Sequence, residues 1–194
     1  NHHDGETFFN FERANMDMPI AKIWEVLKEF TNPVKNVKPE GNIEPILLNP
    51  STIGKEPMKT KVTWFGHSTF LVEIDGKVIL LDPMFGQQAA PHPWLGSNRY
   101  NPTFPVEIEN LPKIDAVVFS HDHYDHLDYG SVEGLMDKVG HWLVPLGLDN
   151  HLVEWGIKKD KITALDWWQE SFQSDIQFVL TPSRHFSGRG ITDR

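Results

Sequence analysis

The sequence predicts an α/β fold built around a mixed β-sheet. Two short apolar segments are joined by Asp75-Gly76, a dipeptide typical of the tight turn of a β-hairpin. From Ala116 onward, short apolar runs alternate with helical patterns, which is the order of strand–helix–strand units. The length of 194 residues is enough for one domain with a sizeable core. Hairpins followed by strand–helix–strand units give a sheet with both antiparallel and parallel pairs.

Residues 1–60 are polar and rich in asparagine, proline and lysine, and we expect them to form an N-terminal extension. They contain one amphipathic helix, expected over residues 19–30. Its apolar side chains at helical spacing are Ile20, Ile23, Trp24, Leu27 and Phe30. We expect the helix to pack on the domain. The alternative is a peripheral membrane contact or a partner surface, which Trp24 and Phe30 would suit.

The chain becomes more apolar after residue 60, and three short strands are expected there. They are Val62–Phe65, Thr69–Ile74 and Lys77–Leu81. Residues 83–112 are rich in proline, glycine and asparagine and predict a long ordered loop, a feature that is often functional.

Strands and helices are expected to alternate through the rest of the domain, which we take as residues 61–194. The expected strands are 116–120, 141–146, 161–165 and 176–180, and the expected helices are 131–139 and 148–156. Gly156 suits the end of the second helix.

The composition excludes several classes of protein. The net charge is −9, with 27 acidic and 18 basic side chains, which argues against a nucleic-acid binder because such proteins carry a basic face. The chain has no cysteine, so disulfides and thiolate metal sites are excluded. No apolar run approaches the roughly 20 residues of a membrane-spanning helix. The composition leaves the compartment open, with the cytoplasm or a membrane surface favoured.

Three histidines and three aspartates occupy the eight residues that follow the apolar strand "AVVFS". If the chain stays extended there, His121 and His123 point the same way and suit two ligands of one metal ion. Asp122 then points away from that ion. After Tyr124 the chain must turn, so that the next two residues, "DH", can face a second ion.

Imidazole and carboxylate groups without thiolate suit zinc, with iron or manganese as alternatives. The competing interpretation of the cluster is a solvated polar loop, or a cap at the start of the helix expected at 131–139. The spacing H-x-H-x-D-H directly after an apolar strand favours a metal site over that interpretation.

The segment "SHDHYDHLD" resembles the H-x-H-x-D-H motif of the metallo-β-lactamase superfamily. The similarity continues through "TWFGHSTFLVEIDGKVILLDPMFG", "LPKIDAVVF", "VPLG", "LDWWQE" and "TPSRHFSGRG". Together these segments are similar to the branch that contains N-acyl-phosphatidylethanolamine-hydrolysing phospholipase D and its bacterial relatives. The resemblance covers most of residues 60–190 and implies the αββα sandwich of that superfamily.

The resemblance assigns the ligand-type residues to two zinc ions. The first ion would be held by His121, His123 and His185, and the second by Asp125 and His126. The last two are also expected to act in catalysis.

Two further residues are expected near the ions. Asp82 matches a buried acidic residue of the superfamily and could orient a ligand imidazole, although an aspartate that caps the turn before Pro83 is the alternative. His67 could make either a structural hydrogen bond or a contact to the substrate.

The superfamily also supplies a bridging aspartate and a later histidine, which the 194 residues do not contain. Five of about seven expected protein ligands are therefore present. We expect the chain to be the N-terminal portion of the sandwich, completed by further sequence of the same domain. If the 194 residues exist alone, an exposed sheet face and a half-built two-metal centre are expected, and activity is doubtful.

The leading functional hypothesis is a metal-dependent phosphodiesterase that acts on a phospholipid of the N-acyl-phosphatidylethanolamine type. A hydroxide held between two ions would be the nucleophile, since metal coordination lowers the pKa of water to about 7. Aromatic side chains are plentiful around the expected site: Phe85, Trp94, Tyr124, Trp167 and Trp168. Most of them are expected to serve core or loop packing. The alternatives are a lactonase-type hydrolase and a non-catalytic metal-binding module.

Overall fold

The computed structural model describes residues 3, 7–11, 22, 24, 25, 28, 35, 36, 38–90, 92, 98–101, 103–187 and 189. Most of the helix expected over residues 19–30 lies outside this set, so that helix stays a prediction. Among the described residues, no helix is both long enough and apolar enough to cross a membrane.

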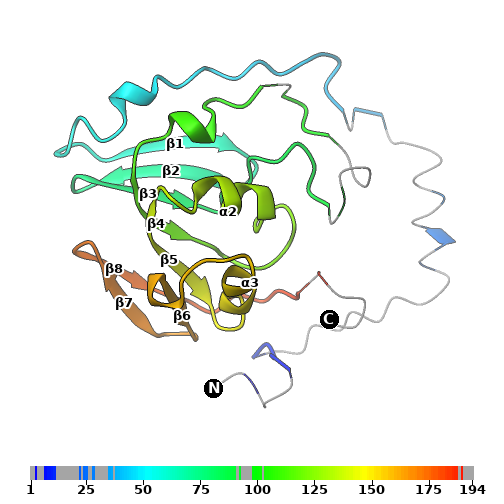
Figure 1. Ribbon diagram of the computed structural model, residues 1–194. Coiled ribbons are helices and arrows are strands. Elements are labelled where there is room, and N and C mark those ends of the chain that lie inside the picture. The colour runs from blue at the N-terminus through cyan, green and yellow to red at the C-terminus, as the bar shows by residue number, and fades with distance from the viewer. Residues whose placement is uncertain are drawn as a thin grey trace.

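The centre of the fold is a six-stranded mixed sheet in the order β1-β2-β3-β4-β5-β6 (Figure 1). The strands are β1 (Lys61–Gly66), β2 (Thr69–Ile74), β3 (Lys77–Leu81), β4 (Ile114–Val118), β5 (Val139–Pro145) and β6 (Ile162–Leu165). The first three pair antiparallel, and β3 to β6 pair parallel. The prediction of a mixed sheet is confirmed.

Short helices and a hairpin complete the described elements. They are η1 (Pro50–Thr52), η2 (Ile108–Asn110), α2 (Tyr129–Leu135), α3 (Asp149–Glu154), η3 (Lys159–Lys161), β7 (Glu170–Gln173) and β8 (Ile176–Val179). The last two strands form a separate antiparallel pair.

The predicted β2–β3 hairpin is confirmed. Asp75 has a φ of 49° and Gly76 a φ of 74°, so both turn residues adopt the left-handed conformation that a tight hairpin turn needs. The turn places Ile74 opposite Lys77 and fixes the register of the two strands.

The helix expected at 131–139 begins and ends earlier, as α2. The Asp128 side chain accepts a hydrogen bond from the Ser131 backbone N–H at 2.9 Å, which caps the helix N-terminus. β5 begins at Val139, so the end of the expected helix belongs to a turn and a strand. The sequence also gave no indication of β7, whose segment "ESFQ" contains a single apolar residue.

Helices α2 and α3 lie on one face of the sheet (Figure 1), and the larger core fills the space between them. Val132 and Leu152 of the helices and Leu80 and Val117 of the sheet are all 0% exposed. On the opposite face, the β7–β8 hairpin packs against a smaller cluster around Ile79, Ala116, Leu143 and Leu165. The sheet is therefore covered by helices on one face only in the described part of the chain.

The parallel strands β3 and β4 end at the same edge of the sheet. Residues that follow their carboxyl ends are brought together there, which is where open α/β sheets place binding sites. Asp82 follows β3 directly. Residues 121–127, which we call the histidine-rich turn, follow β4.

Candidate metal centre

The ends of β3 and β4 are joined by hydrogen bonds from one aspartate. The backbone N–H of Asp82 donates to the Val118 carbonyl at 2.9 Å. One carboxylate oxygen of Asp82 accepts from the Ser120 backbone N–H at 2.7 Å, and the other accepts from the Ser120 hydroxyl at 2.7 Å. This carboxylate fixes where the chain leaves β4 and hence where the following histidines lie.

Three histidines meet beyond that point. The ring centroids of His121, His123 and His185 lie 4.5–4.6 Å from one another, and one ring nitrogen of each lies within 4.8 Å of the others. The structure thus brings together the three residues assigned to the first ion, although 62 residues separate His123 from His185.

The donor atoms of this group are suited to a metal ion. The Nε2 atoms of His121 and His123 are buried and have no hydrogen-bond partner among the described residues. Buried polar atoms in proteins are nearly always paired, so two such nitrogens side by side need a ligand. A divalent cation would satisfy both, and the site therefore fits the metal that the sequence motif implies.

A second group lies beside the first and consists of His67, Asp125 and His126. His67 Nε2 lies 2.7 Å from Asp125 Oδ2, and His126 Nε2 lies 3.7 Å from the same oxygen. The rings of His121 and His126 are 3.9 Å apart, so the two groups are adjacent. Sequence reasoning placed two ligand-type residues here, and the structure adds His67 to them.

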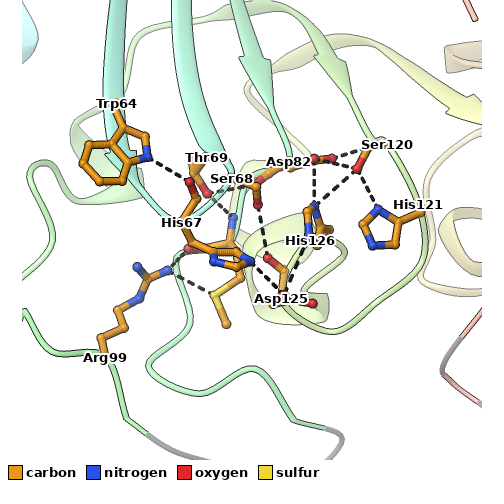
Figure 2. A network of polar contacts seen from close by, with 11 residues as sticks. Trp64, His67, Ser68, Thr69, Asp82, Arg99, Ser120, His121, Asp125 and His126 are labelled. Carbon is orange, nitrogen blue, oxygen red and sulfur yellow. Dashed lines mark hydrogen bonds and ion pairs between the residues drawn. The ribbon is translucent and has the colours of Figure 1, made fainter. Parts of the chain in front are cut away.

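His67 reaches the group from the turn between β1 and β2. Its backbone is left-handed, with a φ of 48°, and its carbonyl accepts a hydrogen bond from Trp64 Nε1 at 2.8 Å (Figure 2). Ser68 adds a contact from its hydroxyl to the Asp125 carbonyl at 3.5 Å. The β1–β2 turn is therefore anchored on the histidine-rich turn.

Asp82 and Ser120 contact the Nδ1 atoms of His126 and His121, the ring nitrogens on the side away from the expected ions (Figure 2). His126 Nδ1 lies 2.9 Å from Asp82 Oδ2, and His121 Nδ1 lies 2.8 Å from the Ser120 hydroxyl. A carboxylate that accepts from one ring nitrogen directs the other nitrogen toward a metal. Ser120 was not singled out from the sequence, where its position directly before the motif is the one available signal.

The surroundings of His121 and His185 disfavour a positive charge on their rings. Burial lowers the pKa of His121 to about 4, and the neighbouring charges of His126, His185 and His123 act in the same direction. The pKa of His185 is also lowered, first by burial and then by His123 and His126. Neutral imidazoles offer the lone pairs that a cation requires.

In the second group, the pKa shifts favour a protonated His126 beside an ionised Asp125. Burial disfavours charge on His126, but the hydrogen bond and charge of Asp82 and the charge of Asp125 outweigh it and raise the pKa of the ring. For Asp125, burial opposes ionisation, while its backbone hydrogen bond and the histidines His126 and His67 lower the pKa of the carboxyl. An ionised carboxylate beside two imidazoles is a donor set that binds zinc, iron or manganese.

His185 is held by a segment from the far N-terminus. The Asn10 side-chain amide donates to the His185 carbonyl at 2.9 Å, and its oxygen accepts from the His185 backbone N–H at 3.3 Å. The ring of the next residue, Phe11, packs on Trp167 with centroids 4.7 Å apart. No pattern in the sequence indicated this contact across 175 residues.

A hollow of about 400 Å³ opens beside the ligand-type residues. It is lined by Ala89, His123, Tyr124, Asp125 and Phe186. Of the other aromatic residues noted in the sequence, Phe85 packs against Phe65 and Phe104. Trp94 lies outside the described residues. The hollow therefore combines metal-binding groups with two aromatic walls.

An α/β fold that gathers two such groups at the carboxyl edge of a mixed sheet defines a metallo-β-lactamase-like protein. The chain belongs to the β-lactamase superfamily, because the family model described as "Beta-lactamase superfamily domain" matches residues 77–194. The predictions of this superfamily and of its α/β fold are confirmed.

The chain is also similar to proteins from bacteria and animals. An uncharacterized protein of Mycobacterium tuberculosis is 38% identical over 198 residues, which cover 99% of this chain and 51% of that protein. N-acyl-phosphatidylethanolamine-hydrolyzing phospholipase D 1 of Caenorhabditis elegans is 36% identical over 140 residues, 68% of this chain and 39% of that protein. A metal-dependent hydrolase of Anaeromyxobacter sp. is 36% identical over 105 residues, 53% of this chain and 33% of that protein. The chain spans about half the length of the first of these relatives and less of the other two.

Proposed function

We propose that the protein is a metal-dependent hydrolase and that this chain carries ligands for two metal ions. The observation that carries the proposal is a pair of buried Nε2 atoms, on His121 and His123, that have no hydrogen-bond partner in the described part of the chain and lie beside the ring of His185. These three residues would hold one ion. His67, Asp125 and His126 would hold the second, with zinc as the expected metal and iron or manganese as alternatives.

The bound ions would supply Lewis acidity and lower the pKa of a coordinated water to about 7. The chain itself holds the imidazoles in the required tautomer. The carboxylate of Asp82 can accept a hydrogen bond from the Nδ1–H of His126, which leaves Nε2 of that ring free for an ion. Asp125, kept ionised by the neighbouring histidines, adds negative charge on the side of the second group.

We propose as substrate a phosphodiester of the N-acyl-phosphatidylethanolamine type. The phospholipase D of Caenorhabditis elegans supports this class, since the chain is 36% identical to it over a segment that includes 68% of the chain. The hollow beside His123 and Asp125 supports it as well, because Tyr124 and Phe186 offer apolar walls for part of a lipid.

Metal content and turnover test the two parts of the proposal separately. Elemental analysis of the purified complete protein should find two zinc ions per molecule, and His121→Ala should remove at least one. His141→Ala is the matched control, because His141 is a partly buried histidine that bonds Thr163 at 2.7 Å outside both groups. A protein that binds no metal, or a control that loses as much metal as His121→Ala, would contradict the metal site.

Turnover should then be compared on vesicles that contain N-acyl-phosphatidylethanolamine and on a simple lactone. We expect release of phosphatidic acid from the vesicles and little opening of the lactone. The reverse result would leave the metal site in place and make the substrate assignment wrong.

A further inference from the structure

Arg189, four positions after His185, contacts the histidine-rich turn through its side chain. The guanidinium of Arg189 donates from Nε to the carbonyl of Asp122 and from Nη2 to the carbonyl of Leu127. These carbonyls stand near the two ends of the turn, between the first two histidines and just after His126. One planar group therefore spans the turn that carries four of the six ligand-type residues.

The contacts of Arg189 hold its guanidinium in one place. Its central carbon lies 4.4 Å from the ring centroid of Tyr124 and 5.5 Å from that of Trp155. Two carbonyl acceptors and two nearby aromatic rings compensate the cation for the water that it loses on burial. The hydroxyl of Ser187 adds a second tie, a hydrogen bond to the Asp122 carboxylate.

We propose that Arg189 is a positioning residue, which holds the turn over residues 121–127 in the shape that both ion sites require. The inference rests on the proposed function, since it concerns the same metal centre. It also assigns a role to Asp122, because its carbonyl and its carboxylate accept the hydrogen bonds that join the turn to the segment after His185. These contacts connect the turn that carries His121 and His123 to the segment that carries His185.

An arginine near a phosphodiester site could instead bind the phosphate of the substrate. The contacts of Arg189 favour bracing, because Nε and Nη2 already donate to backbone carbonyls and the aromatic rings of Tyr124 and Trp155 lie close to the guanidinium. A substrate contact would require the group to leave these partners. The two roles predict different results for metal binding without substrate.

The experiment measures zinc affinity and the absorption spectrum of the cobalt-substituted protein, neither of which needs turnover. Arg189→Met should weaken zinc binding about 10- to 100-fold, as expected when a residue that orients metal ligands is lost. The visible bands of the cobalt form should change as well. Arg189→Lys should restore little, because a compact ammonium on a flexible stem lacks the rigid, planar set of N–H donors with which the guanidinium reaches both the Asp122 and the Leu127 carbonyls.

Lys138→Met is the matched control. Its ammonium also ties two backbone carbonyls, those of Glu109 and Leu111, at 2.8 Å each. Lys138 directly precedes β5, and its carbonyl accepts a hydrogen bond from the N–H of Ile114, the first residue of β4. The histidine-rich turn follows the other end of β4. Loss of the Lys138 ammonium should lower the thermal midpoint and leave zinc affinity and the cobalt spectrum unchanged.

Wild-type zinc affinity and spectrum in Arg189→Met, with a raised KM alone, would overturn the inference in favour of a substrate contact. If that variant does not fold, the decision passes to Arg189→Lys and Ser187→Ala, and unchanged affinity in both overturns it. Equal losses of affinity in Arg189→Met and Lys138→Met would show a general effect on stability and overturn it too. If the unaltered protein binds no zinc, the proposed function itself fails.

Discussion

His67 and Asp82 hold left-handed backbone conformations, with φ values of 48° and 41°, that non-glycine residues adopt at a cost in free energy. Each carbonyl is fastened by a side chain: Trp64 Nε1 donates to that of His67 at 2.8 Å, and the Thr69 hydroxyl donates to that of Asp82 at 2.7 Å. Such conformations persist where surrounding contacts fix them, and they are concentrated at functional sites. The strain therefore supports the assignment of both residues to the site.

Asp82→Asn tests whether the carboxylate behind the imidazoles orients them. The amide keeps the shape but offers one acceptor in place of two, so either the Ser120 contacts or the His126 contact must weaken. We expect zinc affinity to fall about 10- to 100-fold, measured by competition with a chelator. Asp115→Asn is the control, because Asp115 bonds the Val78 N–H at 2.8 Å at the other end of β4. Equal losses in the two variants would contradict the orienting role.

His141 should make stability depend on pH in a defined direction. Burial lowers the pKa of this ring below its ordinary value of 6.5. As the pH falls, the unfolded chain takes up the proton first, so the native state loses stability from about pH 6.5 down to the folded pKa. Above about pH 6.5 the ring is neutral in both states and adds no pH dependence.

The pH effect is measured as a difference between two proteins. Urea unfolding of the unaltered protein and of His141→Gln should be compared at about pH 7.5 and about pH 5. The loss of unfolding free energy on acidification should be smaller in the variant, because the other histidines are the same in both. An identical loss in both proteins would contradict the lowered pKa of His141.

The ligand-type residues differ in how far the sequence could predict them. His121, His123, Asp125 and His126 lie within six positions, so their spacing after a strand already indicates a shared site. His67 lies 58 positions before Asp125, in the turn between β1 and β2. It joins the second group only because those two strands pack beside the histidine-rich turn. Local periodicity carries no information on such long-range contacts, which is why Ser187 and Arg189 were also not predicted.

At the scale of elements, the strands were predictable where apolar residues alternate or run together. β2 and β3 match the expected ranges, and β4 begins two residues before the expected 116. β7 was missed because its alternation is polar and exposed, and it is stabilised by pairing with β8. The end of α2 was misplaced because the following strand, a tertiary feature, competes for residues that suit a helix.

Asn10→Ala tests whether the N-terminal segment helps to hold His185. The substitution removes the two hydrogen bonds to the His185 backbone, at 2.9 and 3.3 Å. We expect weaker zinc binding at the first group and a smaller change at the second, read from titration of the metal-free protein. The control is Asn49→Ala, which removes the cap of η1 at 3.1 Å and touches neither group. Unchanged binding in Asn10→Ala would mean that His185 is placed without the N-terminal segment.

At the scale of the whole molecule, the larger of the two apolar clusters lies on the face of the sheet that α2 and α3 cover. Leu80 points into the cluster beneath α2 and α3 and is 0% exposed, whereas Val62 on β1 is 62% exposed. On the opposite face, β1 is exposed at Val62, whereas the β7–β8 hairpin covers the cluster around Ile79 and Leu143. Whether the 194 residues alone would leave a sheet face exposed stays a prediction.

Shortening an apolar side chain should therefore lower the free energy of unfolding more on the face covered by α2 and α3 than on the opposite face at β1. Leu80→Ala should lower the unfolding free energy by about 2–5 kcal/mol, since it leaves a cavity in a packed core. Val62→Ala should cost less than about 1 kcal/mol, because the side chain is largely in water and only strand propensity is lost. Urea unfolding of both variants measures the difference from the shift in midpoint at constant slope. If Val62→Ala costs as much as Leu80→Ala, this face is buried in solution, and the partner that covers it contributes to the stability of the metal centre's own sheet.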